Sequence, residues 1–244
     1  MAHSKIEIKT DDGTCPAYVF KPDGKGPWPG VLVFMDGIGI RPSQLEIAER
    51  IAAAGYYTLL PDVFYRMGPY EPLVPAKVIG DAEWRTTWFG KIMQIASVDN
   101  IMRDTKAFIA HFAAQPDVKG NAIGVTGYCM GGRLSVCAAG RFGAKIAACG
   151  SYHPGGLVTD TPDSPHKLAP QIKAKLFIAP STDDLQGEDR NQLAQALTDA
   201  KVDFTIEQFH AKHGWVPTDM PVYNAAEAER HYKTLFELFA RTLS

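Results

Sequence analysis

Short apolar segments recur along the chain and alternate with longer segments whose apolar residues follow helical spacing. Residues 30–35 are continuously apolar, which is typical of a strand covered on both faces of a sheet, and residues 56–60 predict the next buried strand. Between them, residues 42–55 begin with a proline, keep helical apolar spacing and end in glycine, so they predict a helix. The same reasoning predicts further strands at 5–9, 17–20, 122–125, 146–152, 175–179 and 202–209, and further helices at about 92–114, 192–199 and 225–241.

This alternation of strands and helices predicts an α/β fold with a mostly parallel central sheet and helices on both faces. Residues 5–9 alternate polar and apolar and suit an edge strand. With 244 residues, 45% of them hydrophobic, the chain should form one domain over residues 1–244. Residues 63–82 are rich in proline, glycine and aromatic side chains and predict an irregular segment. Continued to about residue 92, it would form a lid or pocket-lining insertion.

The formal net charge of −2 gives no indication of a nucleic-acid or anionic-membrane partner. The N-terminal residues lack the apolar core of a signal peptide, and no apolar run is long enough to span a bilayer. The cysteines show no metal-ligand spacing, so we expect no metal, a cytoplasmic location and reduced thiols. A homo-oligomer is left open. The four cysteines are Cys15, Cys129, Cys137 and Cys149.

Residues 127–131, Gly-Tyr-Cys-Met-Gly, lie between the strand expected at 122–125 and a run of small and apolar residues at 133–140 that suits a closely packed helix. A sharp strand-to-helix turn crowds the positions two before and two after its central residue, and glycine at both relieves this crowding. The central side chain, here Cys129, can then stand exposed above the sheet. The pattern therefore predicts a nucleophile elbow with cysteine where serine is usual.

The expected turn would also favour catalysis electrostatically. Cys129 would lie at a helix N-terminus, where the helix dipole favours a thiolate. The backbone N–H of Met130 would be free to donate to a developing oxyanion. The alternative is that Cys129 is a small buried hydrophobic residue, as most free cysteines are. The two glycines, with a strand before and a helix after, favour the nucleophile.

Four polar residues fall just past the ends of expected strands, namely Asp36, Cys129, Asp183 and His213. In parallel sheets the functional groups collect at the C-terminal ends of the strands. A thiol that attacks a carbonyl needs a base within hydrogen-bond reach, and the base needs an orienting acid. The chain order nucleophile, acid, histidine is the order of the α/β-hydrolase fold, so Asp183 and His213 are candidates for those two roles.

Each of these two roles has a rival. His213 is preferred to His210 because it stands in a short glycine-containing loop beyond the strand, whereas His210 is at the strand's edge. Asp183 is preferred to Asp184 because it is nearer the strand end. A helix cap is the alternative role for both aspartates, and a surface or core position is the alternative for the histidine.

The segments at residues 127–132, 35–39, 55–66 and 213–215 resemble the dienelactone hydrolase family, also called carboxymethylenebutenolidases. The resemblance covers nearly the whole chain, and the Gly-Tyr-Cys-x-Gly-Gly elbow is its most specific mark. It implies an α/β-hydrolase fold, no cofactor, and a small ester or lactone as the substrate. The triad that it implies is Cys129, Asp183 and His213.

The resemblance also bears on Asp36 and Gly37. Family members have an acid at the position of Asp36, placed to interact with the resting thiol, although in the best-known members it is glutamate. A carboxylate there would raise the pKa of the thiol, so we hypothesise that Asp36 keeps Cys129 neutral and protected from oxidation until substrate binds. The backbone of Gly37 would supply the second oxyanion donor, beside that of Met130.

The best-known members bind a substrate carboxylate through arginines, one of them shortly after the catalytic histidine, where this chain has none. Arg66 matches an arginine of the family, and Arg41 and Arg85 are candidate substitutes; the alternative for each is a solvated surface charge. The resemblance therefore implies the fold and the chemistry of the family for this chain, but not its dienelactone substrate.

Aromatic residues could line an apolar acyl pocket. They are Trp84, Trp88 and Phe89, for which core packing is an equal alternative. Tyr128, inside the elbow, is a further candidate, with filling of space beside the turn as its alternative. Other activities stay open: a thioesterase, a general carboxylesterase, a non-catalytic ligand-binding member of the fold, or a redox-sensing thiol protein.

Overall fold

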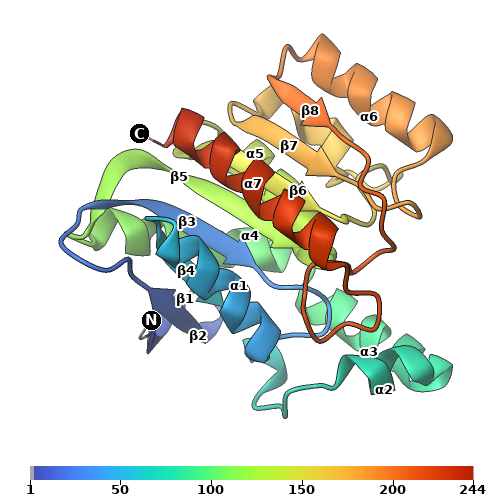
Figure 1. The fold of residues 1–244 in the computed structure, drawn as a ribbon, viewed down its shortest axis with the longest axis horizontal. Coiled ribbons are helices and arrows are strands. Elements are labelled where there is room, and N and C mark those ends of the chain that lie inside the picture. Colours follow the sequence, from blue (N-terminus) through green and yellow to red (C-terminus); the bar gives the residue numbers. More distant parts are fainter. Residues whose placement is uncertain (1–2, 244) are drawn as a thin grey trace.

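A computed structural model describes residues 3–243 of the chain and contains one eight-stranded sheet within that range. The strand order across the sheet is β1-β2-β4-β3-β5-β6-β7-β8, and only the β1–β2 and β2–β4 pairs are antiparallel. This is the mostly parallel arrangement that the sequence predicts, with β1 at an edge as expected (Figure 1). The strands are β1 (His3–Thr10), β2 (Gly13–Phe20), β3 (Trp28–Phe34), β4 (Tyr57–Pro61), β5 (Val118–Tyr128), β6 (Ile146–Tyr152), β7 (Lys175–Ala179) and β8 (Phe204–Ile206).

Helices cover both faces of the sheet. In Figure 1, α1 and α7 lie in front of the sheet and α4 and α5 lie behind it. The α-helices are α1 (Pro42–Ala53), α2 (Pro75–Gly80), α3 (Ala82–Ile95), α4 (Val98–Ala114), α5 (Met130–Phe142), α6 (Gly187–Asp199) and α7 (Ala225–Thr242). Short 3₁₀ helices occur at η1 (Tyr65–Met67), η2 (Gly143–Lys145) and η3 (Pro165–Gln171). No helix in residues 3–243 has the length and apolar character needed to cross a membrane.

The register of the central strands brings their C-terminal ends to one edge of the sheet. Phe34 of β3 pairs with Gly127 of β5, and Tyr128 of β5 pairs with Tyr152 of β6. Tyr152 in turn pairs with Ala179 at the end of β7. Any side chain that directly follows one of these strands therefore lies beside its counterparts from the neighbouring strands.

Two expected elements differ from those observed. The helix expected at about 92–114 is two helices, α3 and α4, because Ser97 interrupts the pattern and caps α4 by accepting a hydrogen bond from the N–H of Asn100. The segment 63–82, expected to be irregular, contains the short helix α2, which begins at Pro75.

Candidate active site

Cys129 stands at a sharp turn between β5 and α5, with backbone angles φ 55° and ψ −117°. A non-glycine residue rarely adopts a positive φ, so the surrounding structure must hold this conformation in place. Packing also explains the flanking glycines. A Cβ atom at Gly127 would collide with the carbonyl oxygen of Gly131, and one at Gly131 would collide with the carbonyl of Phe34. The elbow geometry predicted from the sequence is thus present.

Two backbone N–H groups near Cys129 are free to bind an oxyanion. Within residues 3–243, the N–H groups of Met130 and Gly37 donate no hydrogen bond. The Gly37–Ile38 peptide is held from both sides, because Trp88 Nε1 donates to the Gly37 carbonyl at 2.9 Å and Ile38 N–H donates to Asp36 Oδ1 at 2.9 Å. The loop after β3 is therefore fixed beside the elbow before any substrate binds.

The histidine that reaches Cys129 is His213, whose ring interacts with the Cys129 thiol. Its Nδ1 atom lies 2.8 Å from Oδ1 of Asp184. His210, the rival candidate, is exposed. The structure therefore lines up a thiol, an imidazole and a carboxylate, in the arrangement that activates a nucleophile.

The carboxylate that contacts His213 is that of Asp184, so the prediction that Asp183 orients His213 is wrong. Asp184 N–H donates to the Ser181 carbonyl at 3.3 Å, which closes a tight turn just after β7. In this turn Asp183 is exposed, while the side chain of Asp184 is 11% exposed and returns toward the sheet edge. Distance along the chain from the strand end was a poor guide because the turn reverses the chain within four residues.

Hydrogen bonding sets the protonation of His213. Burial by itself lowers the pKa of His213, but the hydrogen bonds to Asp184 and to Cys129 outweigh it and raise the pKa to about 10. An imidazole that is readily protonated beside a thiol favours proton transfer from sulfur to nitrogen. The three groups can therefore generate a thiolate nucleophile and an imidazolium that later protonates a leaving group.

Asp36 lies at the end of β3, as predicted, but the structure pairs it with Arg41 rather than with the thiol. Arg41 Nη1 and Nη2 donate to Asp36 Oδ1 and Oδ2 at 2.7 and 2.8 Å, and Gln44 Nε2 donates to Oδ2 at 3.0 Å. With Ile38 N–H also donating, the carboxylate has four donors. Among residues 3–243 the Cys129 thiol interacts with His213, and Asp36 lines the same cavity. The hypothesis that Asp36 keeps the thiol neutral stays a prediction.

Arg41 itself is not available to a substrate. Its guanidinium is buried between Asp36 and Asp219, to which Nε donates at 2.8 Å. Asp219 belongs to the loop that follows His213, and it also accepts a hydrogen bond from Ser43 at 2.9 Å. Arg41 therefore connects the loop after β3 to the loop that follows His213.

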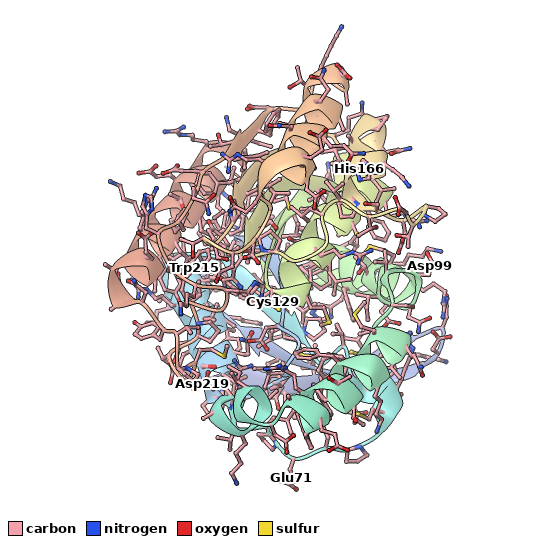
Figure 2. The ribbon with its side chains drawn as sticks, turned by 90° about the vertical axis from the view of Figure 1, so that its right-hand side faces the viewer. Glu71, Asp99, Cys129, His166, Trp215 and Asp219 are labelled. Atoms are coloured by element: carbon pink, nitrogen blue, oxygen red, sulfur yellow. The ribbon has the colours of Figure 1, made fainter. Side chains whose placement is uncertain are left out.

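A cavity of about 220 Å³ opens beside Cys129 and His213. Val78 and Ile79 of α2 and Phe89 of α3 line it, and all three lie within residues 63–92. Figure 2 looks onto this region, with Cys129 near the centre and the α2–α3 segment below it. None of the residues that line the cavity is a lysine or an arginine; the others are Asp36, Gly37, Ile38, His153, Gly214 and Met220.

The remaining arginine candidates lie outside this cavity. Arg66 binds Asp104 through Nη1 at 2.7 Å and Asp12 through Nη2 at 2.6 Å, so it joins two segments of the fold. Arg85 Nη1 donates to the Ile79 carbonyl at 3.0 Å. Neither side chain lines the pocket beside Cys129, and the expectation that they bind a substrate there is not met by this geometry.

Of the aromatic candidates, Trp88 supports the loop after β3 and Tyr128 is packed in the core. Trp88 is buried and holds the Gly37 carbonyl, with the partly exposed Trp84 stacked on it at a centroid distance of 5.4 Å. Tyr128 is fully buried, and its hydroxyl lies 2.9 Å from His231 Nε2. None of these three side chains lines the cavity; of the aromatic candidates, Phe89 does.

His153 is a site residue that the sequence reasoning missed. It follows β6 directly, accepts a hydrogen bond from Cys129 N–H on Nδ1 at 3.1 Å and lines the cavity. The signal was present in the sequence, because residues 146–152 were expected to be a strand and the next residue is this histidine. The strand-end rule, applied to that strand as well, would have found it.

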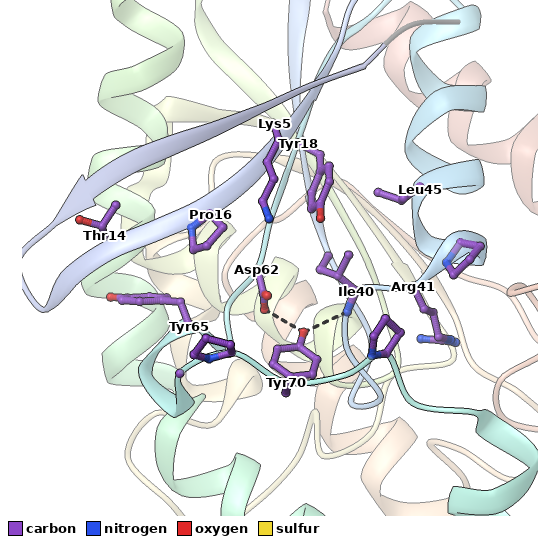
Figure 3. A pocket seen from close by; sticks show the side chains of 14 residues that line it. Lys5, Thr14, Pro16, Tyr18, Ile40, Arg41, Leu45, Asp62, Tyr65 and Tyr70 are labelled. Carbon is purple, nitrogen blue, oxygen red and sulfur yellow. Dashed lines mark hydrogen bonds between the residues drawn. The ribbon is translucent and has the colours of Figure 1, made fainter.

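A second and larger cavity of about 490 Å³ lies on the side of β1 and β2 (Figure 3). Tyr70 donates to Asp62 Oδ1 at 3.0 Å and accepts from Ile40 N–H at 3.2 Å there, and Lys5 extends toward the same space. Cys129, His213 and Asp184 do not line it, so it is separate from the candidate active site. Among residues 3–243 no cluster of three or more His, Cys, Asp or Glu side chains could hold a metal ion.

Comparison with known proteins identifies the family of this chain. Residues 15–243 match the family described as "Dienelactone hydrolase family". A relative from Synechocystis sp., named "Putative carboxymethylenebutenolidase", is 25% identical over 253 residues, covering 98% of this chain and 99% of the relative. A carboxymethylenebutenolidase from Pseudomonas sp. is 31% identical over 111 residues, which cover 46% of this chain and 44% of the relative.

Solved structures show the same architecture. The crystal structure titled "Putative Dienelactone Hydrolase" from Klebsiella pneumoniae superposes with a TM-score of 0.85, at 19% identity and with 98% of each chain covered. At that identity the likeness concerns the fold, which is the α/β-hydrolase fold.

Proposed function

This chain belongs to the dienelactone hydrolase family and is a carboxylic ester hydrolase, and from that premise we propose that it cleaves small, uncharged esters or lactones with Cys129 as the nucleophile. His213 is the general base, and Asp184 is the acid that orients it. Met130 and Gly37 supply the oxyanion hole through their backbone N–H groups. The observation that carries this assignment is the Nδ1–Oδ1 distance of 2.8 Å between His213 and Asp184, with the other side of the imidazole at the thiol.

The reaction proceeds in two displacements. His213 holds the proton taken from the Cys129 thiol as an imidazolium, and the thiolate sulfur of Cys129 adds to the substrate carbonyl. The resulting oxyanion accepts hydrogen bonds from the N–H groups of Met130 and Gly37. The tetrahedral intermediate expels the alkoxide, which takes the proton back from His213, and leaves an acyl thioester on Cys129. A water molecule then loses its proton to His213 and attacks the thioester, which releases the carboxylic acid and restores the thiol.

The cavity indicates an uncharged substrate. No lysine or arginine lines the 220 Å³ space beside Cys129, and the buried Arg41 is already paired with Asp36 and Asp219. A substrate carboxylate would therefore enter without a lysine or arginine partner and beside the carboxylate of Asp36, at a large desolvation cost. Val78, Ile79 and Phe89 instead offer apolar contacts to a short acyl group.

The test is hydrolysis of p-nitrophenyl acetate and of a simple lactone by the wild type and by Cys129→Ala. We expect the variant to lose turnover by at least about 10³-fold while retaining the fold, because the nucleophile is removed. Cys149→Ala is the matched control, since Cys149 is a fully buried thiol of β6. Wild-type turnover in Cys129→Ala would refute the assignment.

A further inference from the structure

His153 has no role in the mechanism above, although it lines the same cavity as Cys129 and His213. The residue is fully buried, and its backbone adopts φ 38°, a left-handed conformation that few non-glycine residues take. Histidine, asparagine and aspartate tolerate this region better than most residues. Two residues with positive φ, Cys129 and His153, thus follow two neighbouring strands, β5 and β6.

The side chain of His153 contacts the backbone of Cys129. Cys129 N–H donates to Nδ1 of His153 at 3.1 Å and shares the same hydrogen with the Tyr152 carbonyl, also at 3.1 Å. The N–H of Cys129 is the group whose direction is set by the unusual φ of that residue. Two acceptors converging on it hold the elbow in a conformation that the chain would otherwise leave.

The same residue contacts the base and the strand that leads to the acid. The ring of His153 meets the ring of His213 edge to face at a centroid distance of 5.2 Å, and Trp215 at 4.7 Å. The backbone N–H of His153 donates to the carbonyl of Ala179, the last residue of β7, at 2.8 Å. Asp184 lies in the turn that follows that strand. His153 therefore touches the supports of all three members of the proposed triad.

The ring can serve as an acceptor only in its neutral form. Burial, with the nearby His213 and His231, keeps the pKa of His153 well below its ordinary value. With Nδ1 accepting from Cys129, the ring hydrogen resides on Nε2, which has no hydrogen-bond partner within residues 3–243. A buried donor without a partner is unfavourable, so the fold retains this ring at a cost.

We propose that His153 is a positioning residue: its neutral Nδ1 atom holds the Cys129 peptide in the strained elbow, so that the thiol faces His213 and the Met130 N–H faces the oxyanion. This inference rests on the proposed function, because it concerns the orientation of the same nucleophile. It predicts that the acceptor at the Nδ1 position matters more than the bulk of the ring.

Two substitutions distinguish the hydrogen-bond acceptor of His153 from the bulk of its ring. In His153→Asn the side-chain oxygen takes the place of Nδ1, and asparagine accepts positive φ. In His153→Phe the ring remains but the acceptor is lost. We expect His153→Asn to keep kcat within about 3-fold of the wild type. We expect His153→Phe to lower kcat by about 10- to 100-fold with KM little changed, since a small displacement of the nucleophile has effects of that size.

A second readout reports on the thiol without turnover. The second-order rate of Cys129 alkylation by iodoacetamide, measured from pH 5 to pH 10, should follow the wild-type profile in His153→Asn and be displaced in His153→Phe. His166→Asn is the matched control, because His166 is also buried but bonds to Ser164 away from the site. It should leave both readouts unchanged.

The opposite ranking, with His153→Phe active and a folded His153→Asn impaired, would overturn the inference in favour of ring packing. Wild-type values in both variants would overturn it as well. Thermal unfolding reports whether each variant folds; if His153→Phe does not, retention of kcat by His153→Asn still supports the inference and its loss still contradicts it. A failure of the proposed function is seen separately, as wild-type turnover in Cys129→Ala.

Discussion

Arg41 and Asp36 form a bidentate ion pair, Nη1 to Oδ1 at 2.7 Å and Nη2 to Oδ2 at 2.8 Å, with both side chains almost fully buried. The pair links the N-terminal end of α1 to the loop that carries Gly37. Through Asp219, Arg41 also holds the loop that follows His213. The loop that carries Gly37 and the loop that follows His213 thus share one buried cation.

Arg41→Met should therefore be strongly destabilising. It leaves the Asp36 carboxylate buried with Gln44 and Ile38 as its remaining donors, and breaking a buried pair in this way costs about 3–5 kcal/mol. Arg50→Met is the matched control, since Arg50 pairs with Glu229 on the surface. Urea unfolding should show a change of less than about 1 kcal/mol for the control. Equal losses in the two variants would contradict the role of the buried pair.

Asp184→Asn should lower kcat by about 10³- to 10⁴-fold, because an amide in place of the carboxylate no longer fixes the tautomer and orientation of His213. Asp183→Asn should stay within about 2-fold, because Asp183 is exposed and does not contact His213. Steady-state hydrolysis of one ester by both variants gives the ranking. If Asp183→Asn were the impaired variant, Asp183 and not Asp184 would be the orienting acid.

Trp88→Phe should lower kcat by about 10-fold with KM nearly constant. The substitution removes the Nε1–H that fixes the Gly37 carbonyl at 2.9 Å, so the oxyanion loop is held less firmly when charge develops. Trp84→Phe is the control: Trp84 stacks on Trp88 but is 38% exposed. An equal effect of both substitutions on kcat would mean that packing, and not the hydrogen bond to Gly37, supports the site.

His213 should stay protonated well above neutral pH. Its pKa of about 10, against an ordinary value of about 6.5, means that the folded chain holds this proton where the unfolded chain releases it. The stability that His213 contributes is therefore fully present below about pH 6.5 and is lost as the pH rises through about 10.

The measurement is an NMR titration of the His213 ring in wild type and in Asp184→Asn. The titration midpoint should fall in the variant, because the hydrogen bond to Asp184 that opposes burial is lost. A midpoint near 6.5 in the wild type would show that His213 gains little from its two partners.

The sequence predicted the position of the strand-to-helix elbow from local chemistry alone. Gly127 and Gly131 are required by contacts within the turn itself, so their spacing is visible in the chain. The parallel order of the strands also followed from the alternation of apolar segments. The family resemblance added the hydrolase activity, and the match over residues 15–243 confirms the family.

Contacts between distant segments could not be predicted in this way. Whether Asp183 or Asp184 meets His213 depends on a turn closed by the Ser181 carbonyl. Whether Asp36 meets the thiol or a cation depends on the side chain of Arg41, which three-dimensional packing directs inward. Both outcomes are decided by the direction of a side chain, and a pattern of residue types carries little information about that direction.

Stoichiometric alkylation of Cys129 tests the central claim most directly. Peptide mass mapping would measure the fraction of each cysteine modified by iodoacetamide, beside the ester hydrolase activity that remains. We predict that Cys129 reacts before Cys15, Cys137 and Cys149, which are all buried, and that activity falls in proportion to its modification and reaches zero when Cys129 is fully labelled. Activity that survives complete labelling of Cys129 would contradict the account.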